Sequence, residues 1–203
     1  MGDALRVGLL GGLRGCGTVI KLSDEHTQLQ VELVDPPLPR HPCGLILALP
    51  RPKMLRRVFR TAAEMGVAHL YLINSVRVEK SYWQSPLLQP DRVDAALTAG
   101  LERAGDTVLP QVHLHPRFKP FIEDQLPGLI GSSACWIAHP GAPEALATQS
   151  GEGLIILGPE GGFVSYEVEL AQSMGAQPVR LSDRILSVDT AVTAALSQSA
   201  ISN

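Results

Sequence analysis

Short apolar runs alternate with helix-like segments over most of the chain, and this alternation constrains the fold more than any other feature. The strand-like runs are 45–49, 69–73, 111–115, 134–139, 154–157 and 178–181. Between them, segments 52–65, 93–104, 165–174 and 188–201 have apolar residues at helical spacing, or proline and glycine at typical helix ends. Strands that alternate with helices predict an α/β fold with a mostly parallel sheet covered on both faces.

The N-terminal part of the chain has a different pattern. Residues 4–35 contain three strand-like runs separated by glycine-rich turns such as 11–17. Residues 35–44 hold four prolines in ten positions, and proline stiffens the backbone and removes hydrogen-bond donors, so we expect a linker there. A segment of about 35 residues rarely holds a core alone. It is expected either to pack on the rest of the chain or to be the remnant of a larger module.

Composition and charge exclude several classes of protein. Apolar residues make up 45% of the chain, which is enough for a core. No apolar run approaches the ~20 residues of a membrane span, and no signal peptide is visible. Three scattered cysteines suit a reducing compartment, so we expect a cytoplasmic protein. The net charge of −3 is unlike that of a general nucleic-acid binder, so any RNA function must depend on a local patch.

The segment "IILGPEGGF" (155–163) is the strongest candidate for a ligand loop. Gly158, Gly161 and Gly162 allow the backbone to approach a ligand closely, and Pro159 makes the loop rigid. The phosphate-loop and dinucleotide-binding patterns are both missing. Glu160 instead suits a ligand with hydroxyl groups or positive charge. The alternative is a tight strand-to-helix turn with a solvated glutamate.

A second loop, within 179–192, also leaves a short strand and enters a helix near Val188. In open α/β sheets, ligands bind where such loops leave the carboxyl ends of strands. Arg184 offers a planar cation suited to a phosphate or a base edge. The alternative for Arg184 is a surface ion pair.

Cations cluster in the helix-like segment "RPKMLRRVFR" (51–60), which has five of them in ten residues. A phosphate-contacting patch and a solvated helix face are both consistent with this cluster. The residues expected to contact RNA are Arg51, Arg56, Arg57, Arg77, Lys80 and Arg184. Tyr82 and Trp83 could stack on a base or pack into the core.

Histidines offer little support for a metal site. His113 and His115 could share one strand face, but no third ligand is suggested nearby, so we predict no metal. His139 follows a strand end, where it is either part of a ligand loop or a satisfied, partly buried histidine.

Two motifs near the C-terminus, "GPEGGF…E" and "LSDRILSVDTA", together resemble the RsmE family of RNA methyltransferases of the SPOUT superfamily. Upstream, "RTAAEMGVAHLYLINSVRVEKS", "LERAGDTVLPQV" and "GDALRV" resemble further family segments, so the similarity covers nearly the whole chain. The family methylates N3 of a uridine in small-subunit ribosomal RNA and uses S-adenosylmethionine.

The resemblance implies a SPOUT-type domain over 41–203, with a trefoil knot at about 134–203, preceded by a partial PUA-like β-barrel segment over 1–40. It implies a homodimer with ribosomal RNA as partner. Arg184 and Glu160 are the implied catalytic candidates. The implied cofactor-binding residues are His139, Pro140, Gly158, Pro159, Glu160, Gly161, Gly162, Leu181, Ile185 and Leu186.

The chain departs from the family pattern at several positions. Ser182 replaces a glycine, Ser187 an arginine and Asp189 a glutamate, while Arg103 and Gly105 replace glutamine and arginine. The family barrel also has about thirty more residues before the region matching "GD", so we expect an internal or mis-assigned start or a reduced RNA-binding module. These departures keep two alternatives open. One is a dimeric RNA-binding or ribosome-binding protein of the same fold with weakened catalysis, and the other is an unrelated α/β enzyme acting on a nucleotide-like ligand.

Overall fold

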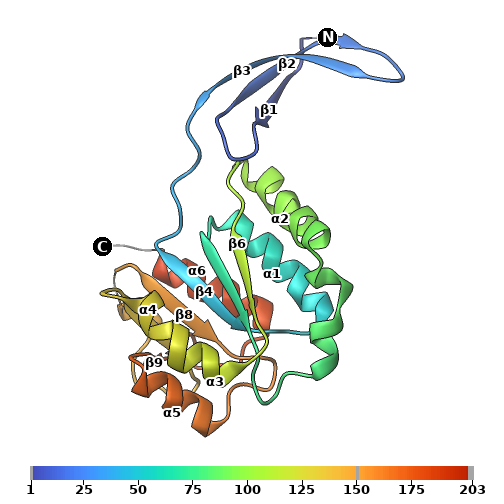
Figure 1. Cartoon of the computed structure of the whole chain (residues 1–203). Helices are drawn as coiled ribbons and strands as arrows, with labels where there is room; N and C mark the ends of the chain where they lie inside the picture. The colour runs from blue at the N-terminus through green and yellow to red at the C-terminus, as the bar shows by residue number, and fades with distance from the viewer. Residues whose placement is uncertain (1, 150, 201–203) are drawn as a thin grey trace.

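The computed structural model describes residues 2–149 and 151–200, which form two β-sheets and a set of helices. A six-stranded main sheet carries helices on both faces, and a three-stranded N-terminal sheet extends away from it (Figure 1). The predicted α/β class is therefore confirmed.

The main sheet is entirely parallel within the described part of the chain. Its strands are β4 (Cys43–Ala48), β5 (His69–Ile73), β6 (Gln111–His115), β7 (Ala134–Ala138), β8 (Gly153–Leu157) and β9 (Gln177–Val179). The spatial order is β6-β5-β4-β8-β7-β9, and each neighbouring pair runs parallel. β4 and β8 lie at the centre and are buried on both faces, as their uninterrupted apolar runs predict.

The four predicted helices are present with small shifts at their ends, except that position 201, the predicted end of the last helix, lies outside the described residues. They are α1 (Pro52–Glu64), α2 (Pro90–Ala104), α5 (Ser165–Ser173) and α6 (Val188–Ser199). Figure 1 places α1, α2 and α6 on one side of the main sheet, and α5 with α3 (Phe118–Pro120) and α4 (Leu126–Ile130) on the other. The buried face of α1 includes Leu55, Val58 and Phe59, whereas its arginines point to solvent.

One helical stretch was not predicted. It consists of α3 (Phe118–Pro120), η3 (Phe121–Gln125) and α4 (Leu126–Ile130) in direct succession. Prolines at 120 and 127 interrupt the pattern, so the segment has no sustained apolar period that would have revealed it. Short helical turns η1 (Lys80–Gln84), η2 (Pro86–Leu88) and η4 (Leu146–Thr148) complete the structure.

The capping position of α5 holds a valine, which has no side-chain hydrogen-bond acceptor. Ser165 is the first residue of the helix, and Val164 holds the capping position. The Glu167 carboxylate accepts a hydrogen bond of 3.0 Å from the Val164 N–H. A carboxylate from the first turn therefore folds back onto the start of the helix.

The N-terminal sheet is antiparallel and consists of β1 (Ala4–Gly8), β2 (Arg14–Leu22) and β3 (Thr27–Asp35). The glycine-rich segment 11–17 was predicted as a turn, yet β2 begins at Arg14. A Cβ at Gly15 would lie 1.9 Å from the Glu32 carbonyl oxygen. This glycine therefore permits close strand pairing rather than a turn.

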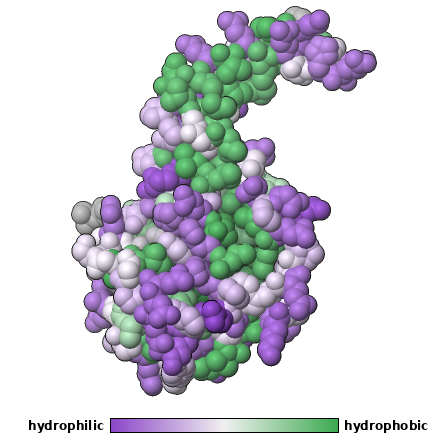
Figure 2. Space-filling view, viewed as in Figure 1, coloured by the Kyte–Doolittle hydropathy of each residue, from purple (hydrophilic) through white to green (hydrophobic). Residues whose placement is uncertain are grey.

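The N-terminal sheet leaves many apolar side chains exposed. Figure 2 shows apolar residues gathered along this sheet, and Leu5, Leu22 and Val31 are each at least half exposed. Three strands without a second layer cannot bury such a face.

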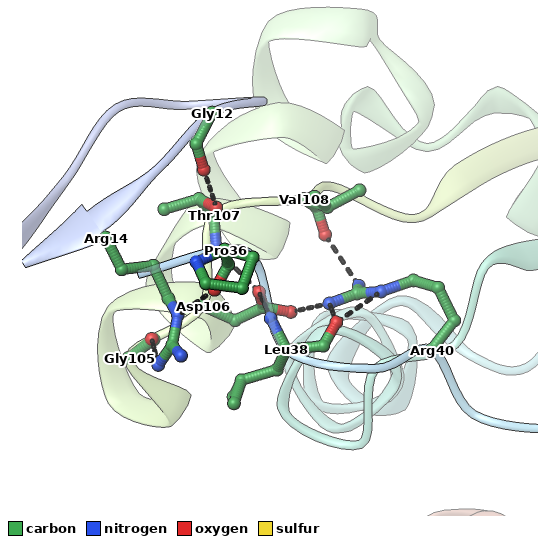
Figure 3. Close-up of polar contacts among 9 residues, drawn as sticks. All are labelled: Gly12, Arg14, Pro36, Leu38, Arg40, Gly105, Asp106, Thr107 and Val108. Carbon is green, nitrogen blue, oxygen red and sulfur yellow. Dashed lines mark hydrogen bonds and ion pairs between the residues drawn. The ribbon is translucent and has the colours of Figure 1, made fainter. Parts of the chain in front are cut away.

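The proline-rich linker is docked rather than free. The Asp106 carboxylate accepts hydrogen bonds from the Leu38 N–H (3.2 Å) and the Thr107 N–H (2.8 Å), and it pairs with Arg40. Thr107 also donates its hydroxyl to the Gly12 carbonyl at 2.6 Å. The loop between α2 and β6 thus holds both the linker and the N-terminal sheet (Figure 3). Within the described residues, no helix is long and apolar enough to cross a membrane.

Candidate active site

A pocket of about 360 Å³ lies where three loops leave the main sheet. The loops are 138–141 after β7, 158–162 after β8 (the glycine loop) and 181–186 after β9 (the Arg184 loop). The pocket is lined by Arg77, Ala138, His139, Pro140, Leu157, Gly158, Pro159, Glu160, Gly161, Gly162, Phe163, Leu181, Ser182, Arg184, Ile185, Leu186, Val188 and Ala191. All ten residues predicted to bind cofactor are among them.

The strand order explains why these loops meet. β8, β7 and β9 are consecutive neighbours in a parallel sheet, so their carboxyl ends share one edge. The sequence indicated each loop separately but did not indicate which loops are neighbours. β9 follows β8 in the chain, yet it pairs with β7. This arrangement places the 181–186 segment across from 138–141.

The glycine loop is a compact turn that needs its glycines. Gly162 has φ 71° and donates its N–H to the Pro159 carbonyl at 2.8 Å. A Cβ at Gly161 would lie 3.0 Å from the Arg77 side chain. Side-chain atoms at either position would strain the turn or push Arg77 away.

Glu160 does not point freely into the pocket. Its Oε1 accepts a hydrogen bond from the Arg51 N–H at 3.2 Å and lies 3.5 Å from the Arg51 Nε. The carboxylate therefore fastens the glycine loop to the start of α1. This pairing suits loop positioning better than proton transfer, because the charge is already engaged.

Arg184 presents an unengaged cation at the pocket. Its backbone N–H donates to the Ser182 hydroxyl at 3.1 Å, which fixes the loop conformation. Among the described residues, its guanidinium has no ion-pair or hydrogen-bond partner. The surface ion pair considered as the alternative is not formed there. Neighbouring Ile185 is 92% exposed, an unusual position for an isoleucine.

His139 is exposed, so the alternative of a partly buried histidine is wrong. Its Nδ1 accepts a hydrogen bond from the Gly141 N–H at 3.2 Å, and its backbone N–H donates to the Val179 carbonyl at 2.9 Å. These contacts hold the 138–141 loop in a tight turn at the pocket wall.

Ser187 directly precedes α6, where the resemblance leads one to expect an arginine. Its hydroxyl lies 2.6 Å from the Asp189 carboxylate, which also pairs with Arg57 at 3.0 Å. The Ser187 hydroxyl, followed by Arg57, holds the pKa of Asp189 below its usual range, although partial burial opposes this. A cation from α1 therefore lies beside the start of α6.

Arg77 reaches the pocket from a fourth loop, 74–78 after β5 (the Arg77 loop). Its guanidinium donates to the Gly161 carbonyl, and its backbone N–H donates to the Ser75 hydroxyl at 3.4 Å. The residue behind this loop, Glu167, is 1% exposed and was not predicted as a site residue. Its only signal in the sequence was the final Glu of "GPEGGF…E".

The remaining predicted RNA contacts are spread more widely. Arg51 and Arg57 pair with residues at or beside the pocket, and Arg56 and Lys80 are exposed. Tyr82 and Trp83 are partly buried against the core, and the Trp83 indole donates to the Asn74 amide oxygen at 3.0 Å. Packing, not an open stacking surface, explains this aromatic pair.

His113 and His115 share one face of β6, as predicted, but they stack with Tyr71 rather than converge on a metal. The Tyr71 and His113 ring centroids are 4.6 Å apart. Within residues 2–149 and 151–200, no group of three or more potential ligands could hold a metal ion.

Gly105 departs from the family pattern for a structural reason. It ends α2 with φ 70°, a conformation that favours glycine. The Arg14 guanidinium lies 3.5 Å from its carbonyl, and the Arg6 guanidinium lies 3.1 Å from where its Cβ would be. Positive charge is thus present at this position from the N-terminal sheet.

Comparison with known proteins identifies the family. A sequence model described as an RNA methyltransferase domain matches residues 36–200. The ribosomal RNA small subunit methyltransferase E of Treponema pallidum is 25% identical over 201 residues, covering 96% of this chain and 75% of the relative. The Synechocystis protein of the same name is 29% identical over 162 residues, covering 77% of this chain and 52% of the relative.

Solved structures share the fold. A Neisseria gonorrhoeae ribosomal RNA small subunit methyltransferase E bound to S-adenosyl methionine has a TM-score of 0.76 at 19% identity, covering 97% of this chain and 81% of that chain. A TrmH-family protein from Porphyromonas gingivalis has a TM-score of 0.52 at 17% identity, covering 80% of this chain and 60% of that chain. At such identities the likeness concerns the fold. The domain match and the curated relatives show that the chain belongs to the RNA methyltransferase family, within its RsmE group.

Proposed function

We propose that this chain is an S-adenosylmethionine-dependent methyltransferase that acts on N3 of a uridine in small-subunit ribosomal RNA. The observation that carries the proposal is the pocket, in which a glycine loop and an unengaged arginine face each other in a chain of this family. The relatives' names supply the substrate class, and the pocket supplies a site that fits it.

The pocket residues suit S-adenosylmethionine. The cavity of about 360 Å³ falls within the range of small-molecule sites. Leu157, Leu181 and Leu186 provide apolar walls, and the three loops provide backbone groups for hydrogen bonds. His139 and Pro140 close one side. We assign the cofactor to these residues together with the glycine loop and Ile185.

The residues of the chain have positioning and electrostatic roles in this reaction. When bound, S-adenosylmethionine supplies a methyl group already activated by its sulfonium. Arg184 is the proposed catalytic residue, because a cation beside the uracil ring stabilises the anion that develops as the N3 proton leaves. We assign Glu160 to shaping the glycine loop through Arg51. Alignment of the two reactants contributes about 7–11 kcal/mol in favourable cases.

RNA is proposed to approach along α1 and the pocket mouth. Arg56 and Arg57 lie on the exposed face of α1, and Arg51 directly precedes this helix. Arg77, in the loop after β5, and Lys80, at the start of η1, extend the positive surface. Arginine and lysine that contact phosphates supply affinity without sequence information. The target uridine must be unpaired or flipped to expose N3.

The finer features of the fold are part of the proposal. We assign residues 1–40 to a partial PUA-like segment and 41–203 to a SPOUT domain with a trefoil knot at about 134–203. Segments of the proposed knot region contact one another: the Arg180 N–H donates to the Glu144 carbonyl at 2.8 Å, and the Gln198 amide donates to the Leu181 carbonyl at 2.9 Å. We further propose that the protein is cytoplasmic and that it forms a homodimer. Light scattering after size-exclusion chromatography measures the oligomeric state.

The first test is calorimetric titration with S-adenosylmethionine and S-adenosylhomocysteine, with ATP as control. We expect micromolar binding of the first two and none of ATP. Transfer of a radiolabelled methyl group to small-subunit ribosomal RNA, with large-subunit RNA as control, then tests the substrate. Folded protein that binds neither sulfur ligand would contradict the proposal, and preferential binding of ATP would favour an unrelated nucleotide enzyme.

Ser187 favours the second candidate, a ribosome-binding protein of this fold with weakened catalysis. In that case Ser187→Arg is expected to create or raise methyl transfer while RNA affinity changes little. An active wild-type protein that the substitution does not improve would exclude this candidate.

A further inference from the structure

Glu167 is a buried carboxylate that the proposed function does not use. It lies in the first turn of α5, is 1% exposed, and is the only buried glutamate among the described residues. A buried carboxylate is costly unless its charge is satisfied by donors. Its partners therefore indicate what it does.

The carboxylate joins two loops that are far apart in sequence. Its Oε1 accepts the Val76 N–H at 2.8 Å, and its Oε2 accepts the Ser75 hydroxyl at 3.2 Å. The same Oε2 accepts the Val164 N–H at 3.0 Å. Val76 belongs to the Arg77 loop, and Val164 directly follows the glycine loop and Phe163.

Arg77 is fixed at both ends by this arrangement. Its backbone N–H donates to the Ser75 hydroxyl, which in turn donates to Glu167. Its guanidinium donates to the Gly161 carbonyl, and its side chain packs where a Cβ at Gly161 would lie. One carboxylate thus sets the backbone position from which Arg77 reaches the pocket.

We propose that Glu167 is a positioning residue that locks the Arg77 loop to the glycine loop and so presents Arg77 to the RNA substrate. The inference rests on the proposed function, because it assigns Arg77 a role in binding RNA. It goes beyond that function by naming the group through which Arg77 acts. Glu167 itself contacts neither substrate nor cofactor.

Glu167→Gln tests the lock because it keeps the side-chain shape and removes the charge and one acceptor. We expect KM for small-subunit ribosomal RNA to rise about tenfold, with kcat little changed. Arg77→Ala should raise KM similarly, and the double variant should be no worse than either single variant. Glu169→Gln, on the exposed side of α5, is the matched control.

Ser75→Ala provides a milder variant if Glu167→Gln does not fold. It removes the hydroxyl that links Glu167 to the Arg77 N–H and leaves the Val76 and Val164 bonds in place. We expect KM for RNA to rise about threefold. Additive effects of Glu167→Gln and Arg77→Ala, or an unchanged KM in both Glu167→Gln and Ser75→Ala, would overturn the inference.

Hydrogen–deuterium exchange separates this inference from the proposed function. In Glu167→Gln, or in Ser75→Ala if the former does not fold, we expect faster exchange in 74–78 than in wild type. Exchange in 158–164 should also rise in Glu167→Gln. Unchanged exchange would overturn the lock even if the enzyme is active. Wild-type protein without methyl transfer would contradict the proposed function and the RNA role of Arg77, while the exchange result still decides whether the two loops are coupled.

Discussion

At the scale of single residues, some charged side chains around the pocket have ion-pair or hydrogen-bond partners and one does not. Glu160 and Asp189 each pair with an arginine of α1, and Arg77 donates to the Gly161 carbonyl. Within the described residues, Arg184 alone among these has no hydrogen-bond or ion-pair partner for its side chain. A free cation at a pocket mouth is suited to an anionic substrate or transition state, whereas the paired carboxylates of Glu160 and Asp189 hold loops in place.

Arg184→Ala is therefore expected to lower kcat for methyl transfer by about 10²-fold, because it removes a charge that acts as the anion develops. Affinity for S-adenosylmethionine should remain within about twofold, since the apolar walls and backbone groups are intact. Steady-state kinetics together with calorimetric titration separates the two effects.

Arg92→Ala is a suitable control for this substitution, because Arg92 is exposed on α2 and, among the residues that the structure describes, pairs only with its neighbour Asp91. Arg184→Lys should keep part of the activity through its charge, although it loses the planar fork. An Arg184→Ala variant with wild-type kcat would remove Arg184 from the catalytic role.

At the scale of secondary-structure elements, the edge of the main sheet carries a stack of rings across β5 and β6. His113 and His115 flank Tyr71, and His69 lies beside His113. Burial lowers the pKa of His113, and the His69 charge lowers it further; burial and His113 do the same for His115. Protonation thus opposes the packing of this edge.

Stability is expected to fall as the pH drops from 7.5 to 5. The folded pKa values of His113 and His115 lie below the unfolded value of about 6.5. At a pH between the folded and the unfolded pKa, the unfolded state therefore binds more protons than the folded state. The two neutral imidazoles make their full contribution to folding stability above the unfolded pKa, and this contribution is lost as the pH falls through the folded pKa. Thermal melts across this range measure the effect.

The double variant His113→Gln, His115→Gln should flatten this pH dependence, even if its melting temperature is lower throughout. His26→Gln removes an exposed imidazole from the N-terminal hairpin and serves as the control. An equally steep dependence in the double variant would show that other groups are responsible.

The elements themselves were largely predictable because their signals are local. Uninterrupted apolar runs revealed β4, β5 and β8, and apolar spacing revealed α1 and α2. The sequence did not reveal that the glycines of 11–17 continue into β2, because that depends on the close approach of β3. The helical stretch from Phe118 to Ile130 was missed because prolines interrupt it.

At the scale of the whole molecule, the N-terminal sheet and the main sheet are held together through the loop that follows α2. Asp106 and Thr107 contact the linker and the turn before β2. Burial is the largest influence on Asp106 and opposes ionisation, but the hydrogen bonds from Arg40, Thr107 and Leu38 together hold its pKa below the usual value. The junction therefore depends on an ionised Asp106.

Asp106→Ala is expected to destabilise the protein by about 2 kcal/mol, because Arg40 and two backbone N–H groups lose a charged partner. The melting temperature should fall by about 4–8 °C. Faster proteolysis in 36–42 would show that the linker has been released. Since the pKa is lowered in the folded state, acid should weaken the wild-type junction as the pH falls through that pKa.

Asp94→Ala is the matched control, because Asp94 is exposed on the same helix that leads into the junction. If Asp106→Ala left both the melting temperature and the proteolysis of the linker unchanged, the junction would not depend on this carboxylate.

The candidate site was predictable only in part, because the whole fold decides which distant loops meet. Motifs within single loops indicated Gly158, Gly162 and Arg184, which all line the pocket. Glu167 was visible as a letter of the motif, but its partners Ser75 and Val76 are about ninety positions away in the chain. Contacts between such distant loops follow from strand order, and local patterns do not encode strand order.

The position of β4 has a consequence for synthesis of the chain on the ribosome. β4 pairs with β5 on one side, but its other neighbour is β8, more than one hundred residues later. Until Gly153–Leu157 emerges, this central strand has an open edge that can pair with other chains. Completion of the sheet is therefore postponed until most of the chain has been made, and long-range pairing of this kind slows folding. A nascent chain of this protein therefore needs protection from aggregation from the time β4 is made until β8 has been made.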